Sequence, residues 1–430
     1  MLKLIFKQLY NRWRANIWIF AELLLVFCLL WYIVDYFFVV GYNRSIPSCR
    51  DLRHTWLVDL GQLPAAHPEY QPDENEPSAM LVNFERALER IRSFDKVDAV
   101  AVVNEMCLPA TGSYWGNEYR NQRDTIRIAS GQIISFDPRT DFFRVFRYTT
   151  SDGKPVSAKD FDWSDPKAIV LGNLALERLS PEKSVNGLLL DQSGDRNASY
   201  PVKGVVGDIK RFDYECPQMA FYMTELVDAD NLDEMIIVIR SRENIPDNRF
   251  RQDFEKKMSH ELRIGNFYLK KITSFDKINI DSEADFGVTN NYRIRTALLV
   301  FFLLNIMLCV MGTFWYRIRI RCGEIGLFMA MGSTRAGIRK LLLMEGIGLL
   351  IAAMLPALLF ESQFVYLGMI DTPGVNENAI DGYLPDRMAV RFILTNCITW
   401  FLLAIVIIAA VWLPADKAAK MPPADALHHE

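Results

Sequence analysis

The stretch RCGEIGLFMAMGSTRAGIRKLLLMEG, residues 321–346, joins two long apolar runs and decides how the rest of the chain is interpreted. A plain turn between membrane spans needs only polar residues, whereas this connection also carries arginines, a glutamate and glycines. An apolar stripe with helical spacing runs through it: Ile325, Phe328, Met329 and Met331. Gly332 is placed to end that helix, and Ser333 or Thr334 is placed to cap the next one. The pattern predicts a short amphipathic helix between two spans.

An exposed stripe that contains Met and Phe is typical of a docking surface. The alternative is that the stripe lies in the lipid interface. The second helix carries Arg335, Arg339 and Lys340 before it enters the next apolar run.

Four apolar runs reach the length of about 20 residues that a bilayer-crossing helix needs. They are residues 17–40, 296–316, 341–360 and 392–413. The first run is too long for a signal peptide and lacks a small-residue cleavage site, so we interpret it as a retained anchor. The sequence therefore predicts a multi-pass membrane protein in contact with the lipid bilayer.

Basic residues orient the spans, because Lys and Arg tend to stay on the cytoplasmic side. Residues 1–16 are basic and are expected to form a cytoplasmic interfacial helix. The loop at 317–340 is basic, whereas the loop at 361–391 is acidic from Glu361 to Asp386. Both termini, including the tail at 414–430, are then cytoplasmic, and a large periplasmic domain follows the first span. We expect the inner membrane as the location. That domain is mildly acidic, which disfavours nucleic acid as a partner.

The exterior segment contains two β-α-β patterns, at residues 41–103 and 232–295. Two such units predict a ferredoxin-like, porter-like base. Residues 104–231 are then an inserted β-rich subdomain, whose clearest strand is 201–209. Residues 67–80 are interpreted as a mobile linker. The fold class is an α+β membrane protein with one N-terminal and three C-terminal transmembrane helices.

The sequence contains few motifs that are associated with catalysis or with binding of a nucleotide or metal. It has no G-x-x-x-x-G-K-[ST] loop for nucleotide phosphates, no zinc-ligand spacing and no nucleophile elbow. Three exterior cysteines allow at most one disulfide: Cys49, Cys107 and Cys216. We therefore expect no catalytic residue, no cofactor and no metal in this chain, and a function through movement or binding.

Acids within the first span are candidates for intramembrane polar contacts, because a charge in hydrocarbon is costly. Glu22 is expected to pair with Arg12, Arg14 or a basic residue of another chain. Asp35 lies close enough to the outer boundary to be hydrated. An ion relay would need further intramembrane acids, and the other spans supply none near their centres.

Residues 321–334 resemble the R-x-x-E-I-G-x-x-x-A-x-G-[AS]-[ST] signature of the MacB/FtsX-type permeases of ABC transporters, which is followed by a glutamate, here Glu345. Residues 141–211 are similar to the MacB-like periplasmic core domain. The ending MPPADALHHE resembles the family's P-x-x-A-L-x-x-E tail. His428 stands where a basic residue is usual, and the acidic linker at 67–80 is extended.

The resemblance implies a half-transporter permease that dimerises with a second copy or a paralogue. ATP would be bound by a separate ABC ATP-binding subunit, whose closure moves the periplasmic domain through the spans. The insertion at 104–231 would be the family's sabre-like subdomain. The implied ATPase-coupling residues are Glu324, Ile325, Gly326, Phe328, Met329, Ala330, Gly332 and Ser333. Glu345, from the family motif, and Glu22, from the acids of the first span, are the candidates for intramembrane polar contacts.

The leading hypothesis is export or efflux from the cell envelope, with membrane-fusion and outer-membrane components as further partners. One alternative is an ABC-linked regulator of a cell-wall hydrolase, or an envelope sensor. Another is a membrane-anchored binding protein without an ATPase, which the coupling loop disfavours.

Overall fold

The computed structural model describes residues 13–112, 114–193, 195–374, 383–420 and 422. The chain divides into two compact units. The helical unit comprises Met1–Tyr42, Thr289–Pro373 and Gly382–Glu430, and the α/β unit comprises Asn43–Val288 and Gly374–Asp381. Most of the expected interfacial helix at 1–16 and the tail motif at the C-terminus lie outside the described residues.

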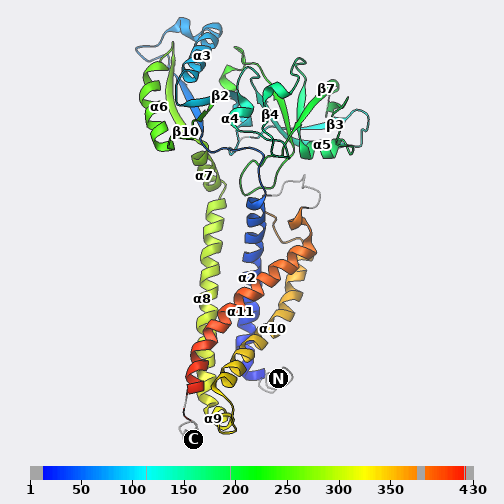
Figure 1. Ribbon diagram of the computed structural model, residues 1–430, viewed down its shortest axis with the longest axis vertical. Helices are drawn as coiled ribbons and strands as arrows, with labels where there is room; N and C mark the ends of the chain where they lie inside the picture. The colour runs from blue at the N-terminus through cyan, green and yellow to red at the C-terminus, as the bar shows by residue number, and fades with distance from the viewer. Residues whose placement is uncertain (1–12, 113, 194, 375–382, 421, 423–430) are drawn as a thin grey trace. The chain divides into compact units, whose positions relative to one another are not determined.

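Four long helices make up most of the helical unit (Figure 1): α2 (Trp13–Ser45), α8 (Val288–Ile320), α10 (Arg335–Tyr366) and α11 (Met388–Lys420). Each is long and apolar enough to cross a membrane, which confirms the four predicted spans. All four extend beyond the predicted apolar runs, because polar residues at their ends continue the helix. The short helix α9 (Cys322–Ala330) lies between α8 and α10 in the sequence, and η5 (Leu384–Asp386) precedes α11.

The helical unit has one apolar core, to which α2, α8, α9, α10 and α11 all contribute. Phe27 of α2 and Leu350 of α10 are fully buried in it. Outward-facing apolar side chains such as Phe301 and Phe401 are more than half exposed, as expected for helices that face lipid.

Half of the α/β unit is a ferredoxin-like domain (Figure 1). Its strands are β1 (Thr55–Gln62), β2 (Val97–Asn104), β9 (Met235–Ser241) and β10 (Phe267–Ser274). They lie in the antiparallel order β10-β1-β9-β2, which is the arrangement produced by two β-α-β units. This confirms the topology predicted from the two patterns.

Two helices complete the β-α-β units: α3 (Pro77–Arg92) and α6 (Asp247–Glu261). Phe250, Phe254 and Met258 recur every fourth residue of α6 and are fully buried in the core that the helices share with the sheet. Pro77 at the first turn starts α3, and Pro72–Asn75 forms the 3-10 helix η1. The segment interpreted as a mobile linker therefore contains helical structure.

The remaining strands are β3 (Gly116–Asn121), β4 (Ile128–Phe136), β5 (Ile169–Gly172), β6 (Leu189–Gln192), β7 (Asp195–Val206) and β8 (Ala220–Thr224). They close into a barrel in the order β4-β3-β6-β7-β5-β8, because β8 pairs with β4 as well as with β5. Closure leaves no free edge. The β-rich character was predicted, whereas the barrel was not.

The barrel and the ferredoxin-like domain share one continuous sheet, since Val103 of β2 pairs with Phe136 of β4. The short helix α5 (Asn173–Leu179) packs on the barrel strands, whereas the short helix α4 (Phe142–Val145) packs on β2 and β9 of the ferredoxin-like domain. Strand β7 begins at Asp195 and ends at Val206, earlier at both ends than the predicted strand at 201–209. The further helix α7 (Phe275–Asp285) follows β10 directly, with the Ser274 hydroxyl accepting a hydrogen bond from the Lys277 amide.

Candidate functional site

The connection at 321–346 folds as the short helix α9 followed by the start of α10. Gly332 has a φ of 97°, and the Ser333 amide donates to the Phe328 carbonyl, so the chain turns out of the helix where a glycine is needed. Thr334 rather than Ser333 caps α10, because the Gly337 amide donates to the Thr334 hydroxyl at 3.1 Å. The helix break between α9 and α10 therefore lies where the sequence indicated.

Most of the apolar stripe of α9 is buried or half-buried, whereas the sequence predicted an exposed docking surface. Ile325 and Gly326 are buried, with Ile325 in the core of the helical unit, and Phe328 and Met329 are half-buried against that core. The stripe therefore mainly holds α9 in place, which corrects the interpretation that all of it is available to a partner. The exposed side of the helix and its turn consists of Glu324, Leu327, Ala330, Met331, Gly332 and Ser333.

Leu327 and Met331 are 53% and 66% exposed. Neither was among the implied coupling residues, and both lie on the same side of the helix as Glu324, since residues three and four apart share a face. Met331 belongs to the apolar stripe predicted from the sequence, whereas Leu327 does not, and the helical spacing of positions 324, 327 and 331 is the signal that could have found Leu327.

A charge network links α8, α9 and α10 through Glu345. Its carboxylate accepts from Arg317 Nη1 at 3.2 Å and from Arg321 Nη1 at 2.9 Å. Arg321 Nε also donates to Glu324 at 3.0 Å. The side chains of Arg317, Arg321 and Glu345 are only 12–13% exposed, whereas Glu324 is 48% exposed. Glu324 is thus the outermost member of a mostly buried network.

Glu22 of α2 contacts α8, where the Cys309 thiol donates to its carboxylate. We expected a basic partner for Glu22. Arg12 lies outside the described residues, and the side chain of Arg14 is not described. Within the described part of the chain, the contact therefore joins two membrane helices through a thiol and a carboxylate.

Asp35 is buried, which corrects the expectation that it is hydrated. It is 3% exposed and accepts two hydrogen bonds from Arg391 of α11, from Nε at 2.8 Å and from Nη2 at 2.5 Å. Arg391 also donates to the Thr372 hydroxyl and the Asp371 carbonyl. Sequence analysis assigned Arg391 to the loop at 361–391, but α11 begins at Met388.

Glu361 was assigned to the same exterior loop and also lies in a helix. α10 continues to Tyr366, and Glu361 is 1% exposed within the helical unit. The prediction that the later spans supply no acid near their centres is not contradicted, because Glu361 lies in the C-terminal part of α10. Sequence analysis placed Glu361 in a loop because the apolar run ends at Phe360, whereas the helix continues to Tyr366.

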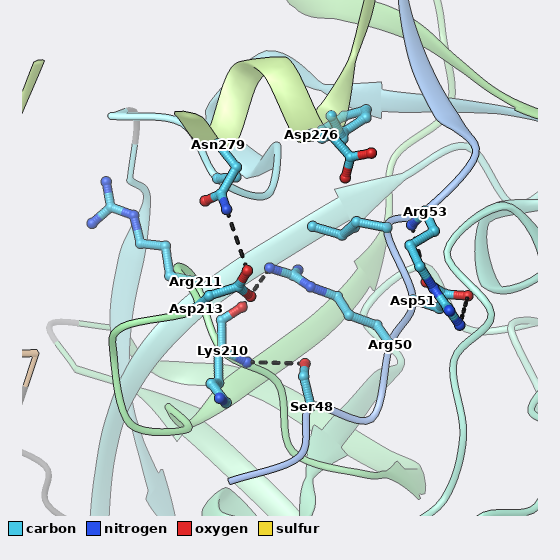
Figure 2. Close-up of a pocket in the computed structure, with 12 residues that line it drawn as sticks. Ser48, Arg50, Asp51, Arg53, Lys210, Arg211, Asp213, Asp276 and Asn279 are labelled. Carbon is cyan, nitrogen blue, oxygen red and sulfur yellow. Dashed lines mark hydrogen bonds and ion pairs between the residues drawn. The ribbon is translucent and has the colours of Figure 1, made fainter. Parts of the chain in front are cut away.

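The α/β unit contains a cavity of about 200 Å³ that the sequence did not indicate (Figure 2). Asp276 and Asn279 of α7 lie on one side, and Arg50 and Asp213 lie on the other. Arg50 Nη2 donates to the Lys210 carbonyl at 2.5 Å, and Asn279 donates to Asp213 at 3.3 Å. Charges of both signs face this space, and they come from three segments far apart in the sequence.

Two carboxyls of the α/β unit, the half-buried Asp208 and the buried Glu215, have perturbed pKa values. Burial raises the pKa of Asp208 to about 6, although its carboxylate accepts from the Leu174 amide at 2.8 Å. Burial raises the pKa of Glu215 to about 7, and Gln218 donates to it at 2.7 Å. Both groups favour their protonated forms in the folded α/β unit more than an exposed acid would.

Within the described residues no cluster of His, Cys, Asp and Glu side chains is arranged to hold a metal ion. Within the part of the chain that the structure describes, no disulfide joins any of the cysteines, including Cys49, Cys107 and Cys216. The candidate functional surface is therefore the exposed side of α9 with its charge network, supported by the buried polar contacts between the helices.

Comparison with known families assigns the C-terminal part of the chain. Residues 296–423 match the family model described as the FtsX-like permease C-terminal. No curated protein sequence matches the chain. The matched residues contain α9, α10, α11 and most of α8.

Several solved structures are similar to part of the chain. One is a domain assigned to a permease protein of Porphyromonas gingivalis, with 10% identity, a TM-score of 0.30, and coverage of 52% of this chain and 90% of that chain. The periplasmic region of MacB from Actinobacillus actinomycetemcomitans has 11% identity, a TM-score of 0.31, and coverage of 54% and 94%. The extracellular domain of the noncanonic ABC-type transporter YknZ from Gram-positive bacteria has 12% identity, a TM-score of 0.28, and coverage of 50% and 100%.

The family match includes the whole connection from which the resemblance was drawn, and the four apolar helices have the expected one-plus-three order around an α/β unit. The chain is therefore a membrane protein whose residues 296–423 match the C-terminal family model of the FtsX-like permeases.

Proposed function

We propose that this chain is the permease subunit of an ABC transporter and acts as a mechanotransmitting half-transporter. An ATP-binding subunit on another chain docks on the exposed side of α9, and its movements pass through the long helices to the α/β unit. In this proposal the chain itself performs no catalysis and binds no cofactor. The function of this transporter is export or efflux from the cell envelope.

The observation that carries the proposal is the construction of α9. Ile325 is anchored in the helical core, Glu324 is held by Arg321, and Arg321 is held by Glu345. A force applied to the exposed Glu324, Leu327 and Met331 would therefore be transmitted to α8 and α10 rather than absorbed by a flexible loop. Exposed apolar residues beside a charge also fit a protein partner.

Charge distribution supports the orientation. The basic ends of α8, α10 and α11 that flank α9 would lie in the cytoplasm of the cell inner membrane, where ATP is available. Both termini would then be cytoplasmic, and the α/β unit would be periplasmic. A second copy or a paralogue would complete the transporter, with membrane-fusion and outer-membrane components as candidates for further partners.

Copurification tests the proposal. The detergent-solubilised protein should retain an ATP-binding subunit, and Leu327→Asp should release it because the substitution places a charge in the apolar contact. Leu367→Asp is the matched control, since Leu367 is 66% exposed, against 53% for Leu327, but caps the opposite end of α10. Equal retention by both variants would contradict docking on α9.

The ATP turnover of the purified complex distinguishes export from regulation of a cell-wall hydrolase. ATP turnover should rise with candidate exported compounds. Stimulation only by a cell-wall hydrolase would overturn the export part of the proposal and leave the docking part intact.

A further inference from the structure

The helical unit contains a buried acid that no contact described above uses. Glu361 of α10 is 1% exposed, and neither of its carboxyl oxygens has a hydrogen-bond donor among the described residues. Its polar neighbour is Asn396 of α11, which is 6% exposed. The Asn396 carboxamide oxygen is also buried and without a donor in the described part of the chain.

The groups around this pair do not supply the missing donor. Asn396 Nδ2 already donates to the Phe392 carbonyl of its own helix at 3.0 Å. Cys28 is the titratable group that faces Glu361 from α2. Five positions before Asn396, Arg391 is bound to Asp35 in a bidentate ion pair. The nearest cation on α11 is thus already paired.

Neighbouring hydroxyls are likewise directed elsewhere. The Thr395 hydroxyl donates to the Arg391 carbonyl at 2.9 Å, and the Thr399 hydroxyl donates to the Thr395 carbonyl at 2.9 Å. Among the described residues, the two Glu361 carboxyl oxygens and the Asn396 carboxamide oxygen are therefore buried without a donor of standard hydrogen-bond geometry, and the Asn396 side chain lies beside Glu361.

Protonation of the Glu361 carboxyl would satisfy both buried groups through one hydrogen bond. An ionised carboxylate without a donor or a cation is costly to bury, whereas a neutral carboxyl has an O–H that donates. That O–H would donate to the Asn396 carboxamide oxygen, which removes the burial cost of both groups. Ordinary glutamates lack this reason to hold a proton at neutral pH.

We propose that Glu361 is a proton-binding site in the helical unit, with the Asn396 carboxamide oxygen as the acceptor that holds the proton. Binding forms one O–H bond on Glu361 from a proton of the surrounding water, and no other bond changes. The site is closed by α10 and α11, so the proton exchanges when these helices separate. Protonation thereby favours the conformation in which α10 and α11 are packed together.

Infrared spectroscopy of the purified full-length permease, without nucleotide or ATP-binding subunit, tests this inference. At pH 7 the wild-type protein should show a carboxylic-acid C=O stretch that Glu361→Gln lacks. Glu255→Gln is the control, because Glu255 is a surface acid whose side chain is 41% exposed and ion-paired with Arg251, so it should not contribute. Glu215 contributes to all the spectra and cancels in the differences.

The acceptor is tested by Asn396→Leu. Loss of the carboxamide oxygen weakens the hydrogen bond, so the same C=O band should move to higher frequency. Because Asn396→Leu keeps Glu361, this measurement tests the proposal even if Glu361→Gln does not fold. A wild-type spectrum that matches Glu361→Gln in this region, or a band that Asn396→Leu leaves unmoved, would overturn the proposal. Neither result depends on docking at α9.

Discussion

Arg391 of α11 and Asp35 of α2 are 356 positions apart in the sequence, yet they form a bidentate ion pair inside the helical unit. Their side chains are 2% and 4% exposed. A paired guanidinium and carboxylate satisfy each other in a way that neither could alone in an apolar core. The contact therefore fixes the position of α11 against α2.

Replacing one partner of this ion pair should lower the stability of the folded state more than replacing both. Arg391→Leu or Asp35→Leu leaves a buried charge without its partner, and we expect a loss of about 3–5 kcal/mol of stability. The double variant should recover much of that loss because no charge remains. Thermal unfolding in detergent measures the three variants against Arg387→Leu, an exposed arginine one turn earlier. Additive losses in the double variant would show that the two residues do not interact.

Glu345 should matter more to stability than Glu324, although both bind Arg321. Glu345→Gln leaves Arg317 and Arg321 largely buried without their carboxylate, with an expected cost of about 1–3 kcal/mol. Glu324→Gln breaks a half-exposed contact and should cost less than about 1 kcal/mol. Unfolding midpoints of the two variants compare them directly. A larger loss for Glu324→Gln would contradict the network described here.

The α/β unit should become less stable as the pH rises from about 4.5 to about 7. Glu215 has a folded pKa of about 7, above the usual glutamate value of 4.5, so the folded state binds its proton more tightly than the unfolded state. Its stabilising contribution is complete below the unfolded pKa and is lost as the pH rises through the folded pKa. Asp208, with a folded pKa of about 6, adds a change of the same sign.

Glu215→Gln isolates this effect. The variant should flatten the fall in unfolding midpoint between pH 4.5 and 7.5, because the amide stays neutral throughout. Glu243→Gln is the control, since Glu243 is 59% exposed. A wild-type midpoint that rises over this range would contradict the assigned pKa of Glu215.

Closure of the barrel depends on Gly131 of β4. A Cβ at this position would lie 2.4 Å from the Met219 carbonyl oxygen, next to the start of β8. Gly131→Ala should therefore disturb the β4–β8 pairing and cost about 1–3 kcal/mol. Gly172→Ala is matched to it, because its nearest atoms lie at 3.4 Å, an ordinary contact. Hydrogen exchange of β8 amides should rise in the first variant only, and equal protection in both would show that Gly131 does not limit closure.

The sequence predicted features that depend on local patterns. Apolar runs gave four spans, and Phe250, Phe254 and Met258 at fourth-residue spacing gave a helix packed on a sheet. Gly332 marked the end of α9 because a positive φ favours glycine. Each of these properties is fixed by residues close together in the chain.

Long-range pairing was not predictable in the same way. Nothing near Asp35 in the sequence indicates Arg391, and β8 meets β4 only after the intervening strands have formed. The buried side of α9 was misjudged for a related reason, because a stripe of Ile325, Phe328 and Met329 fits a partner and an internal core equally well. Only the packing of the other helices distinguishes these cases.

Position-specific photo-crosslinking tests docking on α9 most directly. A photoreactive phenylalanine analogue is placed singly at Leu327, Met331 or Leu367 in the full-length permease, which is expressed together with a candidate ATP-binding subunit. We expect adducts with that subunit from positions 327 and 331 and none from position 367. Adducts from position 367 alone, or none from either α9 position in a complex that still copurifies, would contradict the proposal.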